Sequence, residues 1–285
     1  MNYQDIDIST WTQVGEGGIG KTYANAENPD ILLKVNNPDM NGEDKVRREF
    51  ETAQHVLALG LPTPRMYNMV RVGDLFGMTF ECIKDKRSLS RICADDESRI
   101  SEAASLLAAE GKKLHATACN TDFFPNRKAV NLTAIDAAPF VNDEDKAKMR
   151  AFLETVPDET ACVHGDFQPG NMIVSGEGKP YWIDLGWFSY GTPMFDLGHL
   201  YLLCQVYSQF PTTQELFHLT QEQMKAYWEH FAVAYTGSSD HAAFDAQIAK
   251  YVPLEVCYLS YQHPYPAAHQ MFAAVVHSFV EKLYR

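Results

Sequence analysis

The sequence lacks long hydrophobic runs: no stretch of its 285 residues approaches the ~18 uninterrupted apolar residues that a transmembrane helix needs. Its start, MNYQDIDIST, has neither the basic nor the apolar segment of a secretory signal peptide. No fixed-period repeat or low-complexity segment is visible. We therefore expect a cytoplasmic globular protein without a membrane partner.

Basic residues are scarce relative to acidic ones. The chain has 24 Lys and Arg against 37 Asp and Glu, a formal net charge of −13. Such a surface repels the phosphates of nucleic acids and the headgroups of anionic lipids, so we expect no nucleic-acid partner. The charge is compatible with a cationic small molecule, although acidic charge serves chiefly solubility.

Metal-binding cysteine patterns and hydrolase signatures are also missing. The six cysteines form no C-x-x-C pair, and the sequence contains neither an H-E-x-x-H zinc pattern nor a G-x-S-x-G nucleophile elbow. Six cysteines in 285 residues are too few for a disulfide scaffold, and several lie in apolar runs. They indicate buried free thiols in a reducing compartment.

What the sequence does contain is a polar stretch framed by short apolar runs, VHGDFQPGNMIVSGEGKPYWIDLG, residues 163–186. The runs predict strands on both sides of His164, Asp166 and Asn171, and the glycines of residues 175–179 predict a hairpin connection. That hairpin would bring Asp184 back towards Asp166 and Asn171.

Two carboxylates and a carboxamide at strand ends make an oxygen-rich site, which suits Mg²⁺ better than zinc. A metal together with a spare carboxylate is typical of phosphoryl transfer, in which one Asp orients or deprotonates the attacking hydroxyl. The alternative interpretation is a polar turn whose Asx residues only cap the backbone.

The order H-x-D-x-x-x-x-N followed by I-D-x-G resembles the catalytic loop and metal motif of the protein-kinase-like superfamily, and HGDFQPGN resembles its aminoglycoside phosphotransferase and choline kinase branch. The resemblance implies an α+β, two-lobed fold, with a β-rich N-lobe over residues 1–82 and a mainly helical C-lobe over residues 83–285. It implies that Asp166 receives or orients the acceptor hydroxyl, and that Asn171 and Asp184 bind Mg²⁺.

The glycine-rich stretch GEGGIGKT, residues 15–22, has two interpretations. It satisfies the Walker pattern G-x-x-x-x-G-K-[ST] and also the G-x-G-x-x-G of a kinase glycine-rich loop, with Gly15, Gly17, Gly18 and Gly20 approaching the nucleotide phosphates. A Walker loop must open a helix, whereas Asn28 and Pro29 interrupt the chain a few residues later. The hairpin pattern favours the kinase loop, and the alternative to either phosphate-binding role is a flexible surface hairpin.

Lys34 lies within the apolar, β-like run ILLKV. A charged side chain in such a run needs a partner of opposite charge or contact with water. Residues 43–59 read as a helix on which Glu49 lies beside the apolar stripe Val46, Phe50, Ala53 and Leu57. By resemblance, Lys34 and Glu49 form the ion pair that fixes the lysine on the phosphates. Glu51 is the competing partner, and a solvated Glu49 is the alternative.

Glu81 and Ile83 lie where the resemblance places the hinge that binds the adenine edge through backbone groups. Beyond it, apolar spacing predicts helices over residues 96–116, 143–153 and most of the chain after 197. Asp196 resembles the Asp that braces the catalytic loop. The aromatic residues of the last third are expected to be core: Tyr201, Tyr207, Trp228, Tyr258, Tyr261 and Tyr265.

The sequence therefore predicts an ATP- or GTP-dependent, Mg²⁺-dependent kinase of a small hydroxylated molecule. Only eleven residues separate Asp184 from Asp196, too few for the long segment with which protein kinases bind peptides, so a small acceptor is favoured. The alternative is a catalytically silent nucleotide-binding module on the same fold. The sequence does not distinguish among aminoglycosides, amine alcohols, amino acids and sugars as acceptor.

Overall fold

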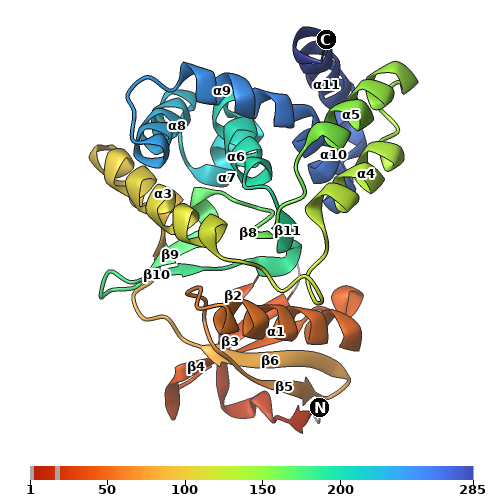
Figure 1. Ribbon diagram of the computed structural model, residues 1–285. Coiled ribbons are helices and arrows are strands. Elements are labelled where there is room, and N and C mark those ends of the chain that lie inside the picture. The colour runs from red at the N-terminus through yellow and green to blue at the C-terminus, as the bar shows by residue number, and fades with distance from the viewer. Residues whose placement is uncertain (1–2, 17–19, 285) are drawn as a thin grey trace. The chain divides into compact units, whose positions relative to one another are not determined.

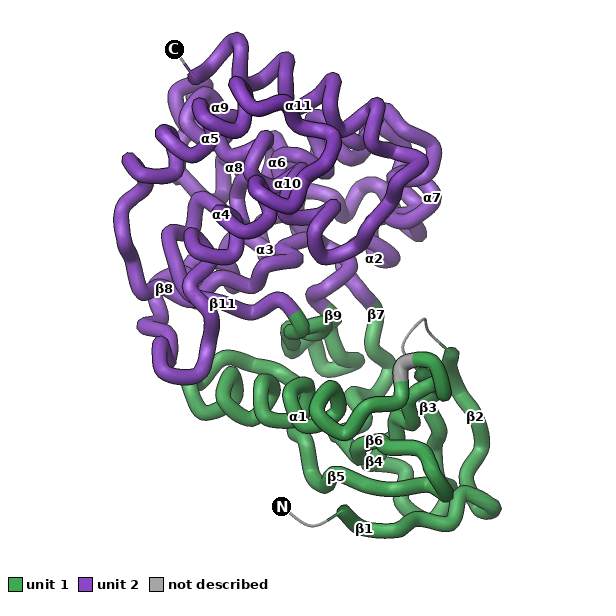
Figure 2. The backbone as a smooth tube through the Cα atoms, turned by 90° about the vertical axis from the view of Figure 1, so that its right-hand side faces the viewer, with its two compact units in different colours: residues 1–87, 173–186 green, residues 88–172, 187–285 purple. Residues whose placement is uncertain are grey.

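The computed structural model describes residues 3–16 and 20–284, which belong to two compact units (Figure 2). Unit 1 comprises residues 1–87 and 173–186, and unit 2 comprises residues 88–172 and 187–285. This division differs from the expected one at residue 82, because the first unit extends further and also includes the segment 173–186.

Unit 1 is built on a six-stranded sheet with the order β1-β5-β6-β4-β3-β2 (Figure 1). Neighbouring strands are antiparallel except for β1 and β5, which are parallel. The strands are β1 (Gln4–Asp5), β2 (Trp11–Glu16), β3 (Gly20–Asn25), β4 (Asn28–Asn36), β5 (Met66–Val72) and β6 (Leu75–Glu81).

The segment after the glycine-rich stretch tests the Walker interpretation. Residues 20–25 form β3, and β4 begins at Asn28 after a short turn. A Walker loop would require a helix here, so the Walker interpretation is wrong. Asn25, Asn28 and Pro29 favour a turn over a helix, and β3 and β4 pair as a hairpin from Gly20 opposite Asn36 onwards.

The helix of unit 1, α1 (Glu43–Ala58), packs on β5 and β6 as its apolar pattern predicts. Val46 and Phe50 form a buried cluster with Met69 and Met78 of those strands. The helix ends at the cap residue Leu59, and the next residue, Gly60, has a φ of +80°.

The prediction that Leu57 belongs to the buried stripe of α1 was wrong. Leu57 is 37 % exposed, whereas Val56 is fully buried. The step from Ala53 to the next core residue is therefore three residues, and both steps are allowed on one helix face.

The hairpin of β9 (Met172–Val174) and β10 (Pro180–Trp182) accounts for the second segment of unit 1. Ser175 N donates to Lys179 O across the turn, as a hairpin connection requires. Gly176 N donates to Lys84 O, and Trp182 N donates to Pro62 O. These two backbone hydrogen bonds join the segment 173–186 to Pro62 and Lys84, which also belong to unit 1.

Unit 2 is mainly helical (Figure 1). The chain enters it at β7 (Arg87–Ser88), and its two-stranded sheet pairs β8 (Ala161–Val163) with β11 (Ser189–Gly191). The helices are α2 (Leu89–Asp95), α3 (Ile100–Ala116), α4 (Arg127–Ala137), α5 (Asp143–Thr155), α6 (Met194–Tyr201), α7 (Pro211–Phe217), α8 (Gln221–Thr236), α9 (Ala242–Ile248), α10 (Val252–Gln262) and α11 (His269–Leu283).

Two helix pairs pack together in unit 2: α3 against α8, and α4 against α10. In each pair one helix also contacts the small sheet, α3 at β8 and α4 at β11. A capping box formed by Thr220 and Gln223 opens α8, and Gly237 with a φ of +76° ends it. The sequence pattern did not reveal α2 or α4, and within the region predicted to be helical after residue 197 it did not distinguish α7 and α10 as separate helices. In the part of the chain that the structure describes, no helix is both long enough and apolar enough to cross a bilayer.

Candidate active site

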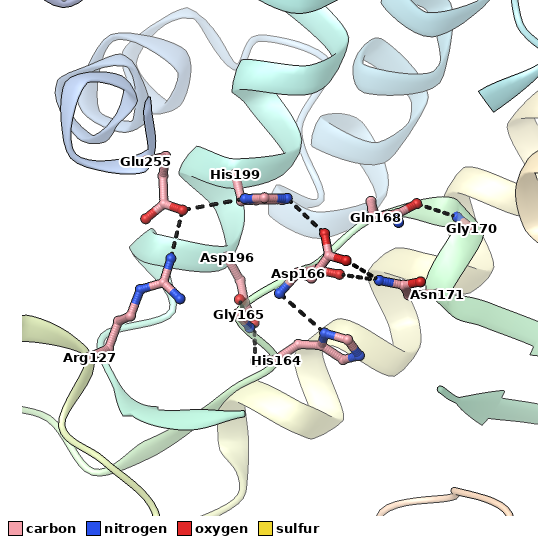
Figure 3. Close-up of polar contacts among 10 residues, drawn as sticks. All are labelled: Arg127, His164, Gly165, Asp166, Gln168, Gly170, Asn171, Asp196, His199 and Glu255. Atoms are coloured by element: carbon pink, nitrogen blue, oxygen red, sulfur yellow. Dashed lines mark hydrogen bonds and ion pairs between the residues drawn. The ribbon is translucent and has the colours of Figure 1, made fainter. Parts of the chain in front are cut away.

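The loop between β8 and β9 is held by Asp196, in the first turn of α6 (Figure 3). Asp196 is completely buried and accepts three hydrogen bonds or close contacts. His164 N lies 2.7 Å from its Oδ2, Gly165 N lies 2.9 Å from its Oδ1, and His115 Nε2 lies 3.1 Å from Oδ2. The structure thus supports the bracing role expected for Asp196, and His115 is a buried structural residue.

Gly165 allows the loop to make its tight turn beside Asp166. Its φ is +88°, a conformation that residues with a side chain rarely adopt. A Cβ atom at this position would lie 2.3 Å from the backbone oxygen of Trp187. A larger residue here would therefore displace the loop.

The Asp166 carboxylate is fixed by a partner on each oxygen. His199 Nε2 lies 3.0 Å from Oδ1, and Asn171 Nδ2 donates to Oδ2 over 2.7 Å. Burial acts to raise the pKa of Asp166, but the hydrogen bond and charge of His199, the charge of His164 and the amide of Asn171 hold this pKa below its usual value. The side chain is 21 % exposed, so an ionised carboxylate with unused lone pairs is available to a ligand.

Asn171 ends a short 3₁₀ turn, Pro169–Asn171, whose cap is Gln168. Gln168 Oε1 accepts from Gly170 N at 2.7 Å, and Asn171 N donates to Gln168 O at 3.0 Å. The Asn171 amide nitrogen donates to the Asp166 backbone oxygen as well as to its carboxylate. Because the nitrogen is committed to Asp166, Oδ1 is the atom with which Asn171 could bind a metal ion.

In unit 1, the predicted partner of Lys34 is present. Lys34 Nζ lies 2.7 Å from Glu49 Oε1, so Glu49 rather than Glu51 forms this ion pair. Lys34 sits in β4 between Thr22 of β3 and Met78 of β6. The ion pair therefore joins β4, which carries Lys34, to α1, which carries Glu49.

The glycine-rich stretch is described only at its two ends. A Cβ atom on Gly20 would lie 2.4 Å from Val35 O, so β3 needs a glycine to approach β4 here. A Cβ atom on Gly15 would meet Thr22 Cβ at an ordinary 3.7 Å, so Gly15 is not required by packing. Gly17 and Gly18 lie outside the described residues, and the phosphate-binding role of the stretch stays a prediction.

The segment expected to bind adenine makes hydrogen bonds to its neighbours in unit 1. Glu81 Oε2 accepts from Arg65 N, and Cys82 N donates to Asp30 O. Ile83 is buried. The backbone N–H of Glu81 also donates to Arg65 O. The hinge role of Glu81 and Ile83 stays a prediction.

Asp184 lies two residues after the end of β10 and has a φ of +58°. Left-handed backbone is uncommon for residues other than glycine, although Asp and Asn tolerate it best. Strained positions of this kind are concentrated at functional sites, which supports attention to Asp184. Asp184 belongs to unit 1, whereas Asp166 and Asn171 belong to unit 2.

Sequence reasoning missed three residues of the Asp166 environment: His199, Glu255 and Arg127 (Figure 3). A signal for His199 existed, because it lies one turn after Asp196 on α6. Glu255 and Arg127 are 128 residues apart along the chain, and no local pattern connects them.

The bracing role of Asp196 predicts a large loss of stability in Asp196→Ala. The backbone N–H groups of His164 and Gly165 would remain buried without an acceptor, at roughly 1–3 kcal/mol each. We expect the free energy of unfolding, measured by urea denaturation, to fall by about 3 kcal/mol or more. Asp122→Ala, at an exposed position, is the control and should change it little; equal losses in both variants would contradict the bracing role.

Comparison with known proteins gives a family and a fold. A sequence model described as "Phosphotransferase enzyme family" matches residues 10–232. No curated protein matches the chain in sequence. A thermostable mutant of aminoglycoside phosphotransferase APH(4)-Ia, solved with AMP-PNP and hygromycin B, has a TM-score of 0.65 at 14 % identity over 96 % of this chain and 94 % of its own.

Two further structures are similar over nearly the whole chain. Choline kinase LicA from Streptococcus pneumoniae has a TM-score of 0.54 at 16 % identity, covering 96 % of this chain and 92 % of its own. Amicoumacin kinase hAmiN, solved with AMP-PNP and Ca²⁺, has a TM-score of 0.58 at 11 % identity, covering 98 % and 90 %. These likenesses confirm the predicted α+β kinase-like fold, with a β-rich N-terminal part and a mainly helical remainder.

Proposed function

This chain belongs to the phosphotransferase enzyme family, and from that premise we propose that it transfers the γ-phosphate of ATP or GTP to a hydroxyl group of a small molecule in a Mg²⁺-dependent reaction. The observation that supports this most is the Asp166 carboxylate. It is ionised, fixed on both oxygens and partly exposed, in a loop braced by a buried Asp.

In the proposed reaction, the acceptor oxygen forms a bond to the γ-phosphorus while the bond from that phosphorus to the bridging oxygen of the nucleotide breaks. The nucleoside diphosphate leaves with the electrons of that bond. The hydroxyl proton passes to Asp166 and then to solvent. Because its pKa is low, Asp166 is a weak base, so it orients the hydroxyl first and receives the proton late. This order suits a loose transition state.

The nucleotide would be bound by residues of unit 1. We propose that backbone groups of the stretch from Gly15 to Gly20 contact the phosphates, since glycines permit close approach. Lys34, held by Glu49, would supply a positive charge to them. Backbone groups of Glu81 and Ile83 would pair with the base.

Asn171 and Asp184 would bind the magnesium ion through a carboxamide and a carboxylate oxygen, a donor set that fits Mg²⁺. Among residues 3–16 and 20–284, no group of three His, Cys, Asp or Glu could hold a metal ion. Such a group is not needed, because Mg²⁺ commonly binds to one or two protein ligands and completes its shell with phosphate and water oxygens. When bound, the ion neutralises charge on the phosphates.

The acceptor is proposed only as a class: aminoglycosides, choline-like amine alcohols, amino acids or sugars. The named ligands of similar structures include hygromycin B, and one of those structures is a choline kinase. The net charge of −13 is compatible with a cationic acceptor. All six cysteines are free, which fits the reducing cytoplasm that we propose as the location.

An acceptor screen tests the proposal. The protein is incubated with Mg²⁺, ATP or GTP and a panel of the four acceptor classes, and both nucleoside diphosphate release and the mass of the product are measured. We expect one class to gain a phosphate in step with diphosphate release. Nucleotide binding without turnover on any acceptor would instead favour the catalytically silent module.

Lys34→Met should weaken the use of the nucleotide. The substitution removes a charged contact to the phosphates, which is worth roughly 1.5–3 kcal/mol, so we expect kcat/KM for ATP to fall roughly 30-fold. Steady-state kinetics with saturating acceptor measure this. Lys45→Met, on the exposed side of α1, is the matched control; a similar fall in both variants would contradict the role of Lys34.

A further inference from the structure

Asp166 is the first member of a chain of four charged groups that reaches into unit 2 (Figure 3). His199 of α6 lies 3.0 Å from Asp166 and 3.4 Å from Glu255 of α10, measured from Nε2 to Oδ1 and from Nδ1 to Oε2. Arg127 of α4 donates from Nη2 to the same Glu255 oxygen at 2.7 Å. Four elements thus contribute alternating negative and positive groups.

The geometry fixes the direction of the hydrogen bond between His199 and Asp166. An ionised carboxylate only accepts, so His199 Nε2 must donate its N–H to Asp166. The other nitrogen faces a second carboxylate, Glu255, so a proton is favoured there as well. Burial acts to lower the pKa of His199, but the hydrogen bonds and charges of Asp166 and Glu255 raise it to about 9. His199 is therefore a cation at neutral pH.

The charge balance explains why such groups are tolerated in the interior. His199, Glu255 and Arg127 are almost completely buried, and isolated buried charges are very costly. With Asp166 the four groups sum to zero. Among the residues that the structure describes, removing His199 would leave Asn171 as the side-chain hydrogen-bond partner of Asp166 and Arg127 as that of Glu255.

The positions of the inner groups are set by packing. The Arg127 guanidinium stacks on the ring of Tyr258, 3.1 Å from its centroid. On α6, a Cβ atom at Gly198 would lie 2.7 Å from Tyr251 Cβ, so this glycine permits the close approach of the helix that presents His199. His199 consequently has little freedom to move.

We propose that His199 is a positioning residue for the phosphoryl transfer proposed above: its Nε2–H holds Asp166 Oδ1, while Glu255 and Arg127 hold the imidazole. The inference rests on the proposed function. With Oδ1 bound to His199 and Oδ2 to Asn171, the carboxylate cannot rotate, and its remaining lone pairs keep one direction for the acceptor hydroxyl. His199 itself contacts Asp166 and not the acceptor.

Kinetics of three His199 variants test the positioning role. Misplacing a catalytic group is costly in rate, so we expect His199→Leu to lower kcat roughly tenfold with KM for ATP unchanged. His199→Gln presents an amide N–H near the position of Nε2 and should return kcat to within about threefold of wild type. His199→Asn is too short to reach Asp166 and should resemble His199→Leu. Equal losses in the Gln and Asn variants would overturn the proposal.

A double-mutant cycle separates positioning from general stabilisation. If His199 acts through Asp166, then adding His199→Leu to Asp166→Asn should lower kcat by less than about twofold further. The same roughly tenfold loss in both backgrounds would mean that His199 acts elsewhere, and would overturn the proposal. This comparison uses only variants whose circular dichroism matches that of the wild type; if His199→Leu does not fold, His199→Asn takes its place.

A spectroscopic measurement keeps this inference separate from the proposed function. In ¹⁵N–¹H spectra of protein labelled at histidine, we expect an imidazole N–H resonance that is protected from exchange, absent in His199→Gln and shifted in Asp166→Asn. A wild type that phosphorylates no acceptor overturns the proposed function. A His199 resonance that does not respond to Asp166→Asn overturns the contact itself, whatever the activity.

Discussion

Asp166→Asn lowers kcat by on the order of 10²-fold or more while leaving nucleotide affinity nearly unchanged, if the carboxylate is the group that receives the acceptor proton. The amide has almost the same size, so the loop should keep its shape. However, it has lost the negative charge, and one of its two polar atoms is now a donor. That donor would face His199 or Asn171, both of which donate to Asp166 in the wild type.

Kinetics with the acceptor found in the screen, together with calorimetric titration of ADP, measure both quantities. Asp122→Asn is the matched control because Asp122 is exposed, and it should behave as wild type. Wild-type turnover in Asp166→Asn would refute the catalytic role. A loss of nucleotide affinity equal to the loss of kcat would show that the substitution had disturbed binding rather than chemistry.

Asp184→Ala should abolish the Mg²⁺-dependent part of nucleotide binding. In the proposed site Asp184 is the only carboxylate that binds the metal, so its removal leaves a single neutral protein ligand, Asn171. The measurement is the dissociation constant of ATP with and without Mg²⁺. In the wild type Mg²⁺ should tighten binding, whereas in the variant the two constants should coincide.

Because Asp184 has a φ of +58°, alanine could also strain the backbone there. Asp184→Asn controls for this, since Asn tolerates left-handed backbone and removes only the charge. We expect Asp184→Asn to lose most of the Mg²⁺ effect as well. Normal Mg²⁺-dependent affinity in both variants would contradict the assignment of Asp184 as a metal ligand.

The sequence predicted most of the local structure around the polar loop because the signals there are short-range. Strands flank His164 to Asn171, the hairpin turns at residues 175–179, and Lys34 pairs with Glu49 across a strand and the following helix. Each of these depends on chemistry within about fifteen residues. Turn residues, alternation and helical spacing are sufficient to encode such contacts.

The region after residue 197 was predicted to be helical, but α10 was not distinguished as a separate helix because it lacks an amphipathic pattern. From Val252 to Tyr258 every side chain of α10 is buried, so no polar face reveals a helical period. Its charged Glu255 looks unexplained in the sequence because its partners, Arg127 and His199, come from other helices. Tertiary contacts of this kind produce no pattern in the neighbouring sequence.

The expectation about aromatic residues was right for the interior and wrong at the end of the chain. Tyr207, Trp228 and Tyr258 are buried as expected of core residues. Tyr261 and Tyr265, however, are 44 % and 60 % exposed. Both lie at the end of α10 and in the loop after it, where helical spacing no longer indicates which side of a residue faces the core.

A crystal structure of the protein with Mg²⁺ and a non-hydrolysable ATP analogue tests the central claim most directly, since the proposed ligands come from both units. The account predicts that Asn171 Oδ1 and the Asp184 carboxylate coordinate the ion. It also predicts that Lys34 contacts the phosphates and that Asp166 faces the γ-phosphate without binding the metal. A nucleotide bound away from Lys34, or an ion bound to neither Asn171 nor Asp184, would contradict it.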